Sequence, residues 1–548
     1  MCGIHAAISR TALDRIDANL EECLRNRGPD HVGTVNVQVD KNASPLQVAL
    51  TATVLALRGD HVAAQPLVDD GSGSVLCWNG EAWKIRGDPV QGNDGEAVLA
   101  LLSVASKHGS AEAILDVLRA IEGPFAFIYL DKPSGTLYYG RDRLGRRSLL
   151  VHRSEGTVQL SSIAPAASAG WVEVEADGCY SMSLDSGIFD MTKRQTRHDW
   201  SNDESLISSI GMFNASIPEP SSTLTDKSES VQELHHHLLQ SLQPRVLEVP
   251  LPPGATESDA RVAVLFSGGL DCTVLARMAS DLLPKGQAID LLNVAFENPR
   301  IASQNKDLGR EDLYELCPDR ITGRKSFAEL SAAVPDRKWR LVTVNVPYTD
   351  TVSHRNTVIN LIAPHNTEMD LSIGYALYFA ARGTGFAQTQ PDAEPCQYST
   401  TARVLLSGLG ADELFGGYLR HETAFQRQGY QGLIDELKLD VGRLGKRNLG
   451  RDDRVMSHWS REVRFPYLDE TFVRWAMGTP VWQKCDFENE TGGNENLVEP
   501  GKRVLRLLAR DIGLEQVALE KKRAIQFGAR TAKMESGKVK GTTLISPG

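Results

Sequence analysis

The chain has 548 residues, of which 41% are apolar, and a net charge of −11. This composition is typical of a globular protein of two to four domains, and the acidic balance argues against binding to nucleic acid or an anionic membrane. The eight cysteines form no CxxC pair, no apolar run approaches about 20 residues, and no secretory signal is recognisable, so we expect reduced thiols and a cytoplasmic location.

The first 200 residues alternate short strand-like runs with Gly, Asp and Pro turns. Strands are expected at residues 32–39, 74–78, 125–130, 136–140 and 148–152. Residues 96–118 carry Leu and Val at helical spacing, which predicts one or two helices. The pattern indicates an α+β domain over residues 2–200 with much antiparallel pairing.

A change of composition marks the middle of the chain. Residues 202–230 are rich in Ser, Thr, Pro and Asp, so we interpret 201–230 as a linker between domains. The second domain is then expected over 231–548.

The second half of the chain alternates strands and helices. Strands are expected at 261–266, 289–296, 341–346 and 403–407, with helices at 272–283 and 367–382. This order predicts an α/β domain with a parallel sheet that binds ligands at the carboxyl ends of its strands. Residues 383–401 are interpreted as a polar insertion.

Cys2 can become a nucleophile if Met1 is removed. The thiol and a free α-amino group would then share one residue and supply nucleophile and base together. Acyl transfer also needs an oxyanion site, and Asn79 and Gly80, after a predicted strand, offer a side-chain amide and a backbone N–H.

Three charged residues are candidates for holding a charged substrate, because a guanidinium can bind a carboxylate and carboxylates can bind an ammonium group. They are Arg58, Glu81 and Asp94. Taken one at a time, such charges are more typical of an exposed surface.

Two glycine-containing loops follow predicted strands in the second half. Ser267, Gly268 and Gly269 lie between a strand and a helix, where successive N–H groups can bind phosphate. The loop lacks the GxxxxGK[ST] pattern of the Walker loop. A second loop begins with Ser407 and Gly408.

Five segments of the N-terminal half resemble, in order, the motifs of class II glutamine amidotransferase domains. They are Met1-Cys2-Gly3-Ile4, Arg27-Gly28-Pro29-Asp30, Gln65-Pro66, Asn79-Gly80-Glu81 and Asp94-Gly95-Glu96. The resemblance implies an αββα sandwich of the N-terminal-nucleophile type. It also implies that Cys2 is nucleophile and base, that Asn79 and Gly80 form the oxyanion hole, and that the three charged candidates bind glutamine.

The second half resembles the PP-loop synthetase domain of asparagine synthetases, through the segments 267–272, 407–418, 465–469 and 521–528. The resemblance implies that ATP or an acyl-adenylate is bound by Ser267, Gly268, Gly269, Asp271, Cys272, Ser407 and Gly408. Asp271 and Asp412 would hold Mg²⁺, which favours oxygen ligands. Lys522 or Arg523 would touch pyrophosphate, although a solvated basic face is an equal interpretation.

The resemblance implies that the chain makes asparagine from aspartate, glutamine and ATP through a β-aspartyl-AMP intermediate. Leu409 stands where the family has a glutamate that assists ammonia attack, and a leucine accepts no proton. Cys272 replaces a serine at little cost. Two alternatives therefore stay open: another carboxylate acceptor, or a binding protein without synthetase activity. Whether the protein forms a homo-oligomer is left open.

Overall fold

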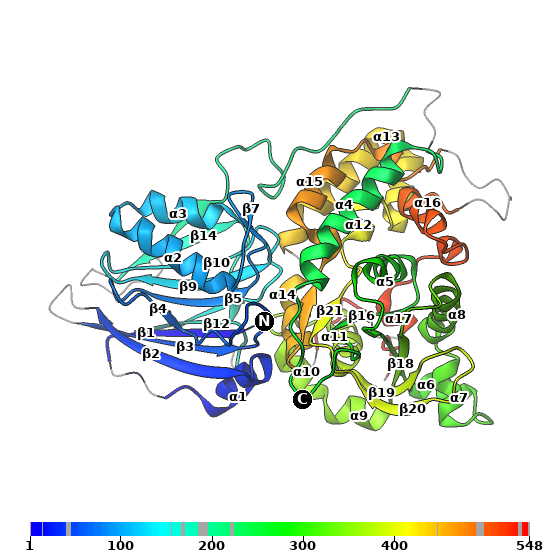
Figure 1. Cartoon of the computed structure of the whole chain (residues 1–548), viewed down its shortest axis with the longest axis horizontal. Helices are drawn as coiled ribbons and strands as arrows, with labels where there is room; N and C mark the ends of the chain where they lie inside the picture. The colour runs from blue at the N-terminus through cyan, green and yellow to red at the C-terminus, as the bar shows by residue number, and fades with distance from the viewer. Residues whose placement is uncertain are drawn as a thin grey trace. The chain divides into compact units, whose positions relative to one another are not determined.

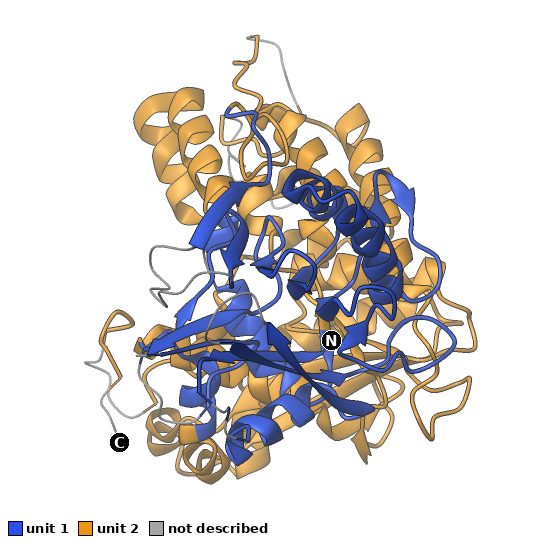
Figure 2. Cartoon of the chain, turned by 90° about the vertical axis from the view of Figure 1, so that its left-hand side faces the viewer, with its two compact units in different colours: residues 1–204, 357–366, 444–462 blue, residues 205–356, 367–443, 463–548 orange. Residues whose placement is uncertain are grey.

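The computed structural model describes residues 2–11, 13, 15–39, 45–154, 156–165, 170–184, 195–219, 224–446, 448–488, 498–534 and 540–545. Met1 and residues 220–223 of the expected linker lie outside them. The chain divides into two compact units (Figures 1 and 2). Unit 1 contains residues 1–204, 357–366 and 444–462, and unit 2 contains the remainder. The two later segments of unit 1 differ from the sequence-based boundary, which gave everything beyond residue 230 to the second domain.

Unit 1 contains two six-stranded antiparallel sheets. The first has the order β13-β11-β12-β1-β3-β2, with β1 Gly3–Ser9, β2 His31–Val39, β3 Leu46–Val54, β11 Leu150–Ser154, β12 Thr157–Ser161 and β13 Val172–Glu173. The second has the order β15-β14-β10-β9-β5-β4, with β4 Leu67–Val68, β5 Val75–Gly80, β9 Phe125–Asp131, β10 Thr136–Arg141, β14 Gly178–Ser183 and β15 Gln195–Asp199. A small third sheet is formed by β6 Lys84–Ile85, β7 Asp88–Pro89 and β8 Ile121–Glu122.

Strand alternation explains how the layers of unit 1 form. In β9, Ala126, Ile128 and Leu130 belong to the apolar core between the two sheets. The residues that alternate with them pack with helices α2 (Asp94–Lys107) and α3 (Ala111–Arg119) on the outer face of the second sheet. Helix α1 (Ala18–Arg27) contacts β1 and β3 of the first sheet (Figure 1). The expected α+β layering with antiparallel sheets is therefore confirmed.

Unit 2 is built on a seven-stranded sheet of order β20-β19-β18-β17-β16-β21-β22. The strands are β16 Val262–Leu265, β17 Ile289–Phe296, β18 Trp339–Val346, β19 Thr384–Gln388, β20 Cys396–Ser399, β21 Val404–Leu406 and β22 Glu462–Arg464. The pairs β18–β17, β17–β16 and β16–β21 are parallel, as expected, whereas β18–β19 and β19–β20 are antiparallel. The sheet is therefore mixed.

The hairpin β19–β20 corrects the prediction of a polar insertion at residues 383–401. Its register pairs Thr384 with Ser399, and the preceding Gly383 adopts the left-handed conformation that ends helix α11 (Glu368–Arg382). A hairpin at a sheet edge needs only one buried face, so its sequence lacks the apolar run that marks a central strand.

Helices surround this sheet, and most of them connect its strands. Those of unit 2 are α4 Glu229–Val246, α5 Leu270–Leu282, α6 Pro299–Gln304, α7 Arg310–Glu315, α8 Pro318–Ala333, α9 Tyr348–Ser353, α11 Glu368–Arg382, α12 Ala411–Phe415, α13 Leu419–Gly442, α15 Glu470–Gly478, α16 Arg503–Asp511 and α17 Ile525–Gly528. Helix α10 (Arg355–Ile362) spans both units, and α14 (Leu449–Ser457) belongs to unit 1. No helix in the described part of the chain is long and apolar enough to cross a membrane.

Candidate active sites

A pocket in unit 1 opens beside Cys2, at the start of β1. It is lined by Cys2, Val54, Leu55, Ala56, Leu57, Arg58, His61, Ala63, Gln65, Trp78, Gly80, Glu81, Asn93 and Asp94. Asn79 is hydrogen-bonded directly to Cys2. The structure therefore brings together all six residues that the sequence analysis assigned to the glutamine site.

The thiol of Cys2 is almost fully buried, with 7% of the residue exposed. Burial raises the pKa of this thiol above its ordinary value, because a thiolate is poorly solvated in the interior. Gln65 Nε2 lies 3.7 Å from the sulfur, and Gln65 Oε1 accepts a hydrogen bond from the Trp78 N–H at 2.8 Å. The thiol is thus held in its protonated form at neutral pH and needs a base before it can attack.

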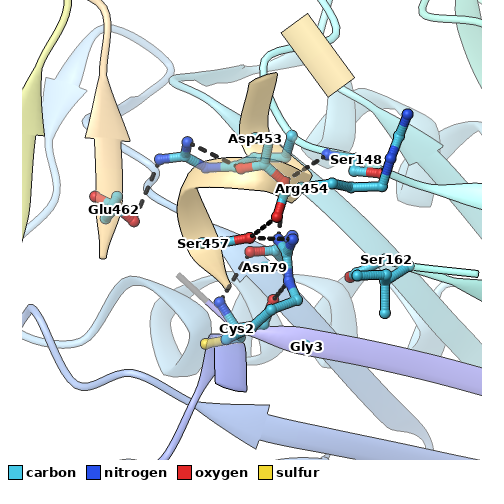
Figure 3. Close-up of polar contacts among 12 residues, drawn as sticks. Cys2, Gly3, Asn79, Ser148, Ser162, Asp453, Arg454, Ser457 and Glu462 are labelled. Atoms are coloured by element: carbon cyan, nitrogen blue, oxygen red, sulfur yellow. Dashed lines mark hydrogen bonds and ion pairs between the residues drawn. The ribbon is translucent and has the colours of Figure 1, made fainter. Parts of the chain in front are cut away.

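The Asn79 side chain is fully buried, and its oxygen and nitrogen atoms differ in their hydrogen bonding. The Cys2 N–H donates to Asn79 Oδ1 at 2.9 Å (Figure 3). Asn79 Nδ2 has no hydrogen-bond partner among the described residues. A buried donor without a partner is uncommon in folded proteins, and this one is available to an oxyanion that forms beside the sulfur.

Gly80 fits its position for a steric reason. Its φ is +159°, and a Cβ there would lie 2.2 Å from the Pro124 carbonyl oxygen. Only glycine allows β5 and the segment before β9 to approach this closely.

The guanidinium of Arg58 is mostly occupied by the protein. It donates to the carbonyl oxygens of Gly92 and Ala82, each at 3.1 Å, and also to that of Val90. A further N–H lies 3.4 Å from Glu81 Oε2. These four contacts use most of its five donors, so a carboxylate at this side chain would receive charge and little bidentate hydrogen bonding.

Asp94 is held at the start of α2. Its Oδ2 accepts from Trp78 Nε1 at 2.9 Å and from the Ala82 N–H at 2.8 Å. Burial raises the pKa of this carboxyl, and Arg58 partly opposes that effect. Asp94 is thus a fixed acidic wall of the pocket.

The two predicted loops of unit 2 lie at the carboxyl ends of the adjacent parallel strands β16 and β21. The first loop passes very close to helix α8, since a Cβ on Gly268 would lie 2.5 Å from the Gly323 nitrogen, and Gly268 has a φ of +79°. The loops also approach each other: a Cβ on Gly408 would lie 2.8 Å from the Asp271 Cβ. This placement matches the expectation for ligand sites in α/β sheets.

Around the first loop, short side chains bond to the turn itself. Gly269 N–H donates to Ser267 Oγ at 3.3 Å, and the Cys272 thiol donates to the Gly269 carbonyl, also at 3.3 Å. Cys272 therefore makes the local bond that a hydroxyl would make.

Lys502 joins the two predicted metal carboxylates. Its Nζ lies 2.7 and 2.9 Å from the two oxygens of Asp271 and 2.9 Å from Asp412 Oδ1. Burial alone would lower the pKa of Lys502, but the two carboxylates outweigh it and raise that pKa. Burial also raises the pKa of Asp271, with Lys502 opposing, whereas Lys502 and Lys522 outweigh burial and lower the pKa of Asp412.

Lys502 was not among the residues predicted from the sequence. It lies in a left-handed conformation directly before α16 and is only 3% exposed. It is 231 residues away from Asp271, and its neighbours in sequence match no motif that the sequence analysis used, so the pattern gave no signal for it.

The two residues predicted to touch pyrophosphate, Lys522 and Arg523, contact different groups. Lys522 Nζ lies 3.8 Å from Asp412 Oδ2 and 4.4 Å from the centre of the Tyr418 ring. Arg523 instead contacts Thr322 Oγ1 at 3.4 Å and Asp319 at 3.8 Å, at the start of α8. The first thus lies at the carboxylate pair, and the second lies beside the Gly268 turn.

Asp271 and Asp412 form a set that fits Mg²⁺. This ion is usually bound by one or two carboxylates together with phosphate oxygens and water. Among the residues that the structure describes, no cluster of three or more His, Cys, Asp or Glu side chains is present that could hold a metal by itself. The single Lys502 ammonium offsets part of the negative charge of the pair.

Comparison with known proteins gives a consistent result. Residues 1–182 match the glutamine amidotransferase domain model, and residues 396–436 and 425–542 match the asparagine synthase model. The asparagine synthetase domain-containing protein 1 of Bos taurus is 33% identical over 99% of this chain and 97% of its own length. The Homo sapiens protein of that name is 32% identical over 98% and 96%.

A more distant relative is named as a synthetase. The putative glutamine-hydrolysing asparagine synthetase 1 of Methanocaldococcus jannaschii is 25% identical over 76% of this chain and 71% of its own length. From the two domain matches and the near full-length relatives, the chain belongs to the family of asparagine synthetase domain-containing proteins.

Proposed function

We propose that the protein hydrolyses glutamine at Cys2 and uses the ammonia, with ATP, to convert aspartate into asparagine. The observation that supports this most strongly is the pairing of the buried Cys2 thiol with the unpartnered Nδ2 of Asn79. The amidotransferase and asparagine synthase matches support a glutamine-hydrolysing ligase of this general kind.

In the glutaminase step, the α-amino group of Cys2, freed by loss of Met1, takes the proton of the thiol. The sulfur attacks the amide carbon of glutamine, and the carbonyl oxygen becomes an oxyanion that Asn79 Nδ2 and the Gly80 N–H stabilise. The proton passes to the nitrogen, ammonia leaves, and water hydrolyses the thioester to glutamate. Asn79 Oδ1 accepts from the Cys2 nitrogen, and this bond orients the amine toward the thiol.

In the synthetase step, the β-carboxylate of aspartate attacks the α-phosphorus of ATP and pyrophosphate leaves. Ammonia then displaces AMP from the β-aspartyl-AMP. Ser267, Gly268, Gly269, Ser407 and Gly408 would form the phosphate and adenylate cradle. Asp271 and Asp412 would hold Mg²⁺, which supplies charge that neutralises phosphate oxygens. Lys502 and Lys522 add positive charge at the same carboxylates.

One observation favours a second candidate function. Leu409 is partly buried, and its N–H lies 3.4 Å from Ser407 Oγ, in the loop where the family has a glutamate. Without an acidic side chain here, ammonia attack on aspartyl-AMP loses a base, at a cost of about 10²–10⁴-fold in rate. An amidotransferase with another carboxylate acceptor is one alternative, and a binding protein without synthetase activity is the other.

The test measures AMP and asparagine from ATP, aspartate and either glutamine or ammonium salts, in wild type and Cys2→Ala. We expect asparagine from both nitrogen sources in wild type and from ammonium alone in the variant. AMP released only with a different acid would support the second candidate. No AMP with any acid, from protein that still hydrolyses glutamine, would contradict both synthetase assignments.

A further inference from the structure

The guanidinium of Arg27 connects the main chain of Cys2 to helix α14. Its Nε donates to the Cys2 carbonyl oxygen at 3.2 Å, and its Nη2 lies 2.8 Å from Asp453 Oδ2. A third contact runs from Nη1 to Ser457 Oγ. Ser457 lies one helical turn after Asp453 on α14 (Figure 3). A segment more than 400 residues away in sequence therefore contacts the group that holds the nucleophile's backbone.

Asp453 is itself fixed by further contacts. The Ser148 N–H donates to its Oδ2 at 3.1 Å, and Arg147 Nη1 lies 3.6 Å from its Oδ1. Arg147 also pairs with Glu462 at 3.2 Å. The Arg27, Arg147, Asp453 and Glu462 side chains are all 0% exposed. Charges buried this completely must keep their partners, so the carboxylate has one stable position.

The residues after Cys2 are held by neutral side chains. The Gly3 N–H donates to Thr53 Oγ1 at 3.0 Å, and the Ile4 N–H donates to Ser162 Oγ at 3.1 Å. Cys2 itself is held at its nitrogen by Asn79 and at its carbonyl oxygen by Arg27. Because the nitrogen and the carbonyl carbon flank the same Cα, fixing both fixes the direction of the Cα–Cβ bond, which limits the sulfur to the staggered rotamers about that bond.

We propose that Asp453 is a positioning residue of the glutaminase site, acting through Arg27 on the backbone of Cys2. This inference rests on the proposed function of Cys2. Reactions of this kind are sensitive to placement, since a shift of about 1 Å can cost roughly 10²-fold in rate. The role predicts a defect in turnover, with glutamine binding left to Arg58, Glu81 and Asp94.

The first test is Asp453→Asn in the full chain, with Asp452→Asn as matched control. Asp452 lies on the same helix, is equally buried and pairs with Arg451 at 2.8 Å. We expect Asp453→Asn to lower the glutaminase kcat about 10- to 100-fold with KM within about threefold. We expect Asp452→Asn to keep the wild-type kcat. A wild-type kcat in Asp453→Asn, a change confined to KM, or an equal loss in both variants would overturn the proposal.

A double variant separates positioning from general stability. Arg27→Met together with Asp453→Asn removes both charges, so we expect the melting temperature to recover relative to either single variant, because no buried charge is left alone. We expect kcat to stay low, because nothing then holds the Cys2 carbonyl. Recovery of kcat together with the melting temperature would show a purely structural ion pair and reject the proposal.

Ser457→Ala is the replacement test variant if Asp453→Asn does not fold. It removes one hydrogen bond to Arg27 and leaves every charge in place, so kcat should fall about 3- to 10-fold with a smaller drop in melting temperature than in Asp453→Asn. An unchanged kcat in this variant counts against the proposal.

The rate of alkylation of the Cys2 thiol by iodoacetamide, measured from the mass of the modified peptide, tests the same thiol without glutamine. We expect it to be roughly tenfold slower in Asp453→Asn than in wild type, because the thiol and its base are misaligned. If wild type failed to hydrolyse glutamine but showed this difference, the proposed function would fail, while the positioning of the Cys2 thiol by Asp453 through Arg27 would stand. Equal alkylation rates would reject that role.

Discussion

The Cys2 pocket and the cluster formed by Lys502, Asp271 and Asp412 accommodate polar groups away from water in opposite ways. In the pocket, a neutral donor, Asn79 Nδ2, is left without a partner among the described residues. In the cluster, the carboxylates of Asp271 and Asp412 are compensated by an ammonium. An unpartnered amide costs about 1–3 kcal/mol and can be kept for a charge that forms during reaction. A lone buried carboxylate costs far more, so the protein supplies a cation.

The largest effect is expected from removing the nucleophile. Cys2→Ala should lower glutamine hydrolysis by at least about 10⁴-fold, because the covalent step has no substitute. AMP formation supported by ammonium salts should stay within about threefold of wild type. Parallel assays with the two nitrogen sources measure this, and a loss of both activities would contradict two separable sites.

Removing the cation of the second site should combine loss of activity with loss of stability. Lys502→Met leaves two partly buried carboxylates, 23% and 18% exposed, facing each other without the ammonium, so we expect a destabilisation of up to about 3 kcal/mol and loss of AMP formation. Urea unfolding and the AMP assay measure the two effects. Lys521→Met is the control, because this side chain is 83% exposed and its loss should change stability by less than about 0.5 kcal/mol. Equal urea-unfolding midpoints for the two variants would argue against charge compensation by Lys502.

Changing the unpartnered donor isolates transition-state stabilisation in the first site. Asn79→Asp keeps Oδ1 for the Cys2 nitrogen and replaces Nδ2 with an acceptor. We expect kcat for glutamine to fall about 10²–10³-fold, with a smaller change in KM. Steady-state kinetics decide this, and a raised KM at normal kcat would mean that the amide binds substrate in its ground state.

Asp319 tests the rule that buried carboxylates need compensation. Burial raises its pKa to about 7, and Arg523, 3.8 Å away, opposes this only in part. A folded pKa above the unfolded value of about 4 means that the folded state holds the proton more tightly. Stability from this group is therefore full below about pH 4 and lost as pH rises through 7.

Asp319→Asn should remove that pH dependence. We expect the variant to be about 2–4 kcal/mol more stable than wild type at pH 8 and nearly unchanged at pH 4. The urea-unfolding midpoints of both proteins at pH 4 and pH 8 measure this difference in stability. An identical pH dependence in both proteins would show that Asp319 is ionised and satisfied across the range.

Local pattern predicted much of this molecule. The strand–turn–helix order around Ser267 and the strand before Ser407 predicted two loops at one sheet edge, and they lie at adjacent parallel strands. Ordered motifs predicted the residues around Cys2, which line one pocket. The mixed sheet was missed in part, because the edge hairpin β19–β20 has no apolar run.

Sequence alone predicted most of the elements, the two loops and the candidate nucleophile Cys2, because each prediction depends on residues that are neighbours along the chain or at fixed periods. Tertiary structure alone decided that Lys502 neutralises Asp271, that Asp453 holds Arg27, and that Arg58 has most of its donors occupied. The paired residues lie far apart in the sequence and meet only in the folded protein. The energy of a buried charge depends on which groups folding places beside it.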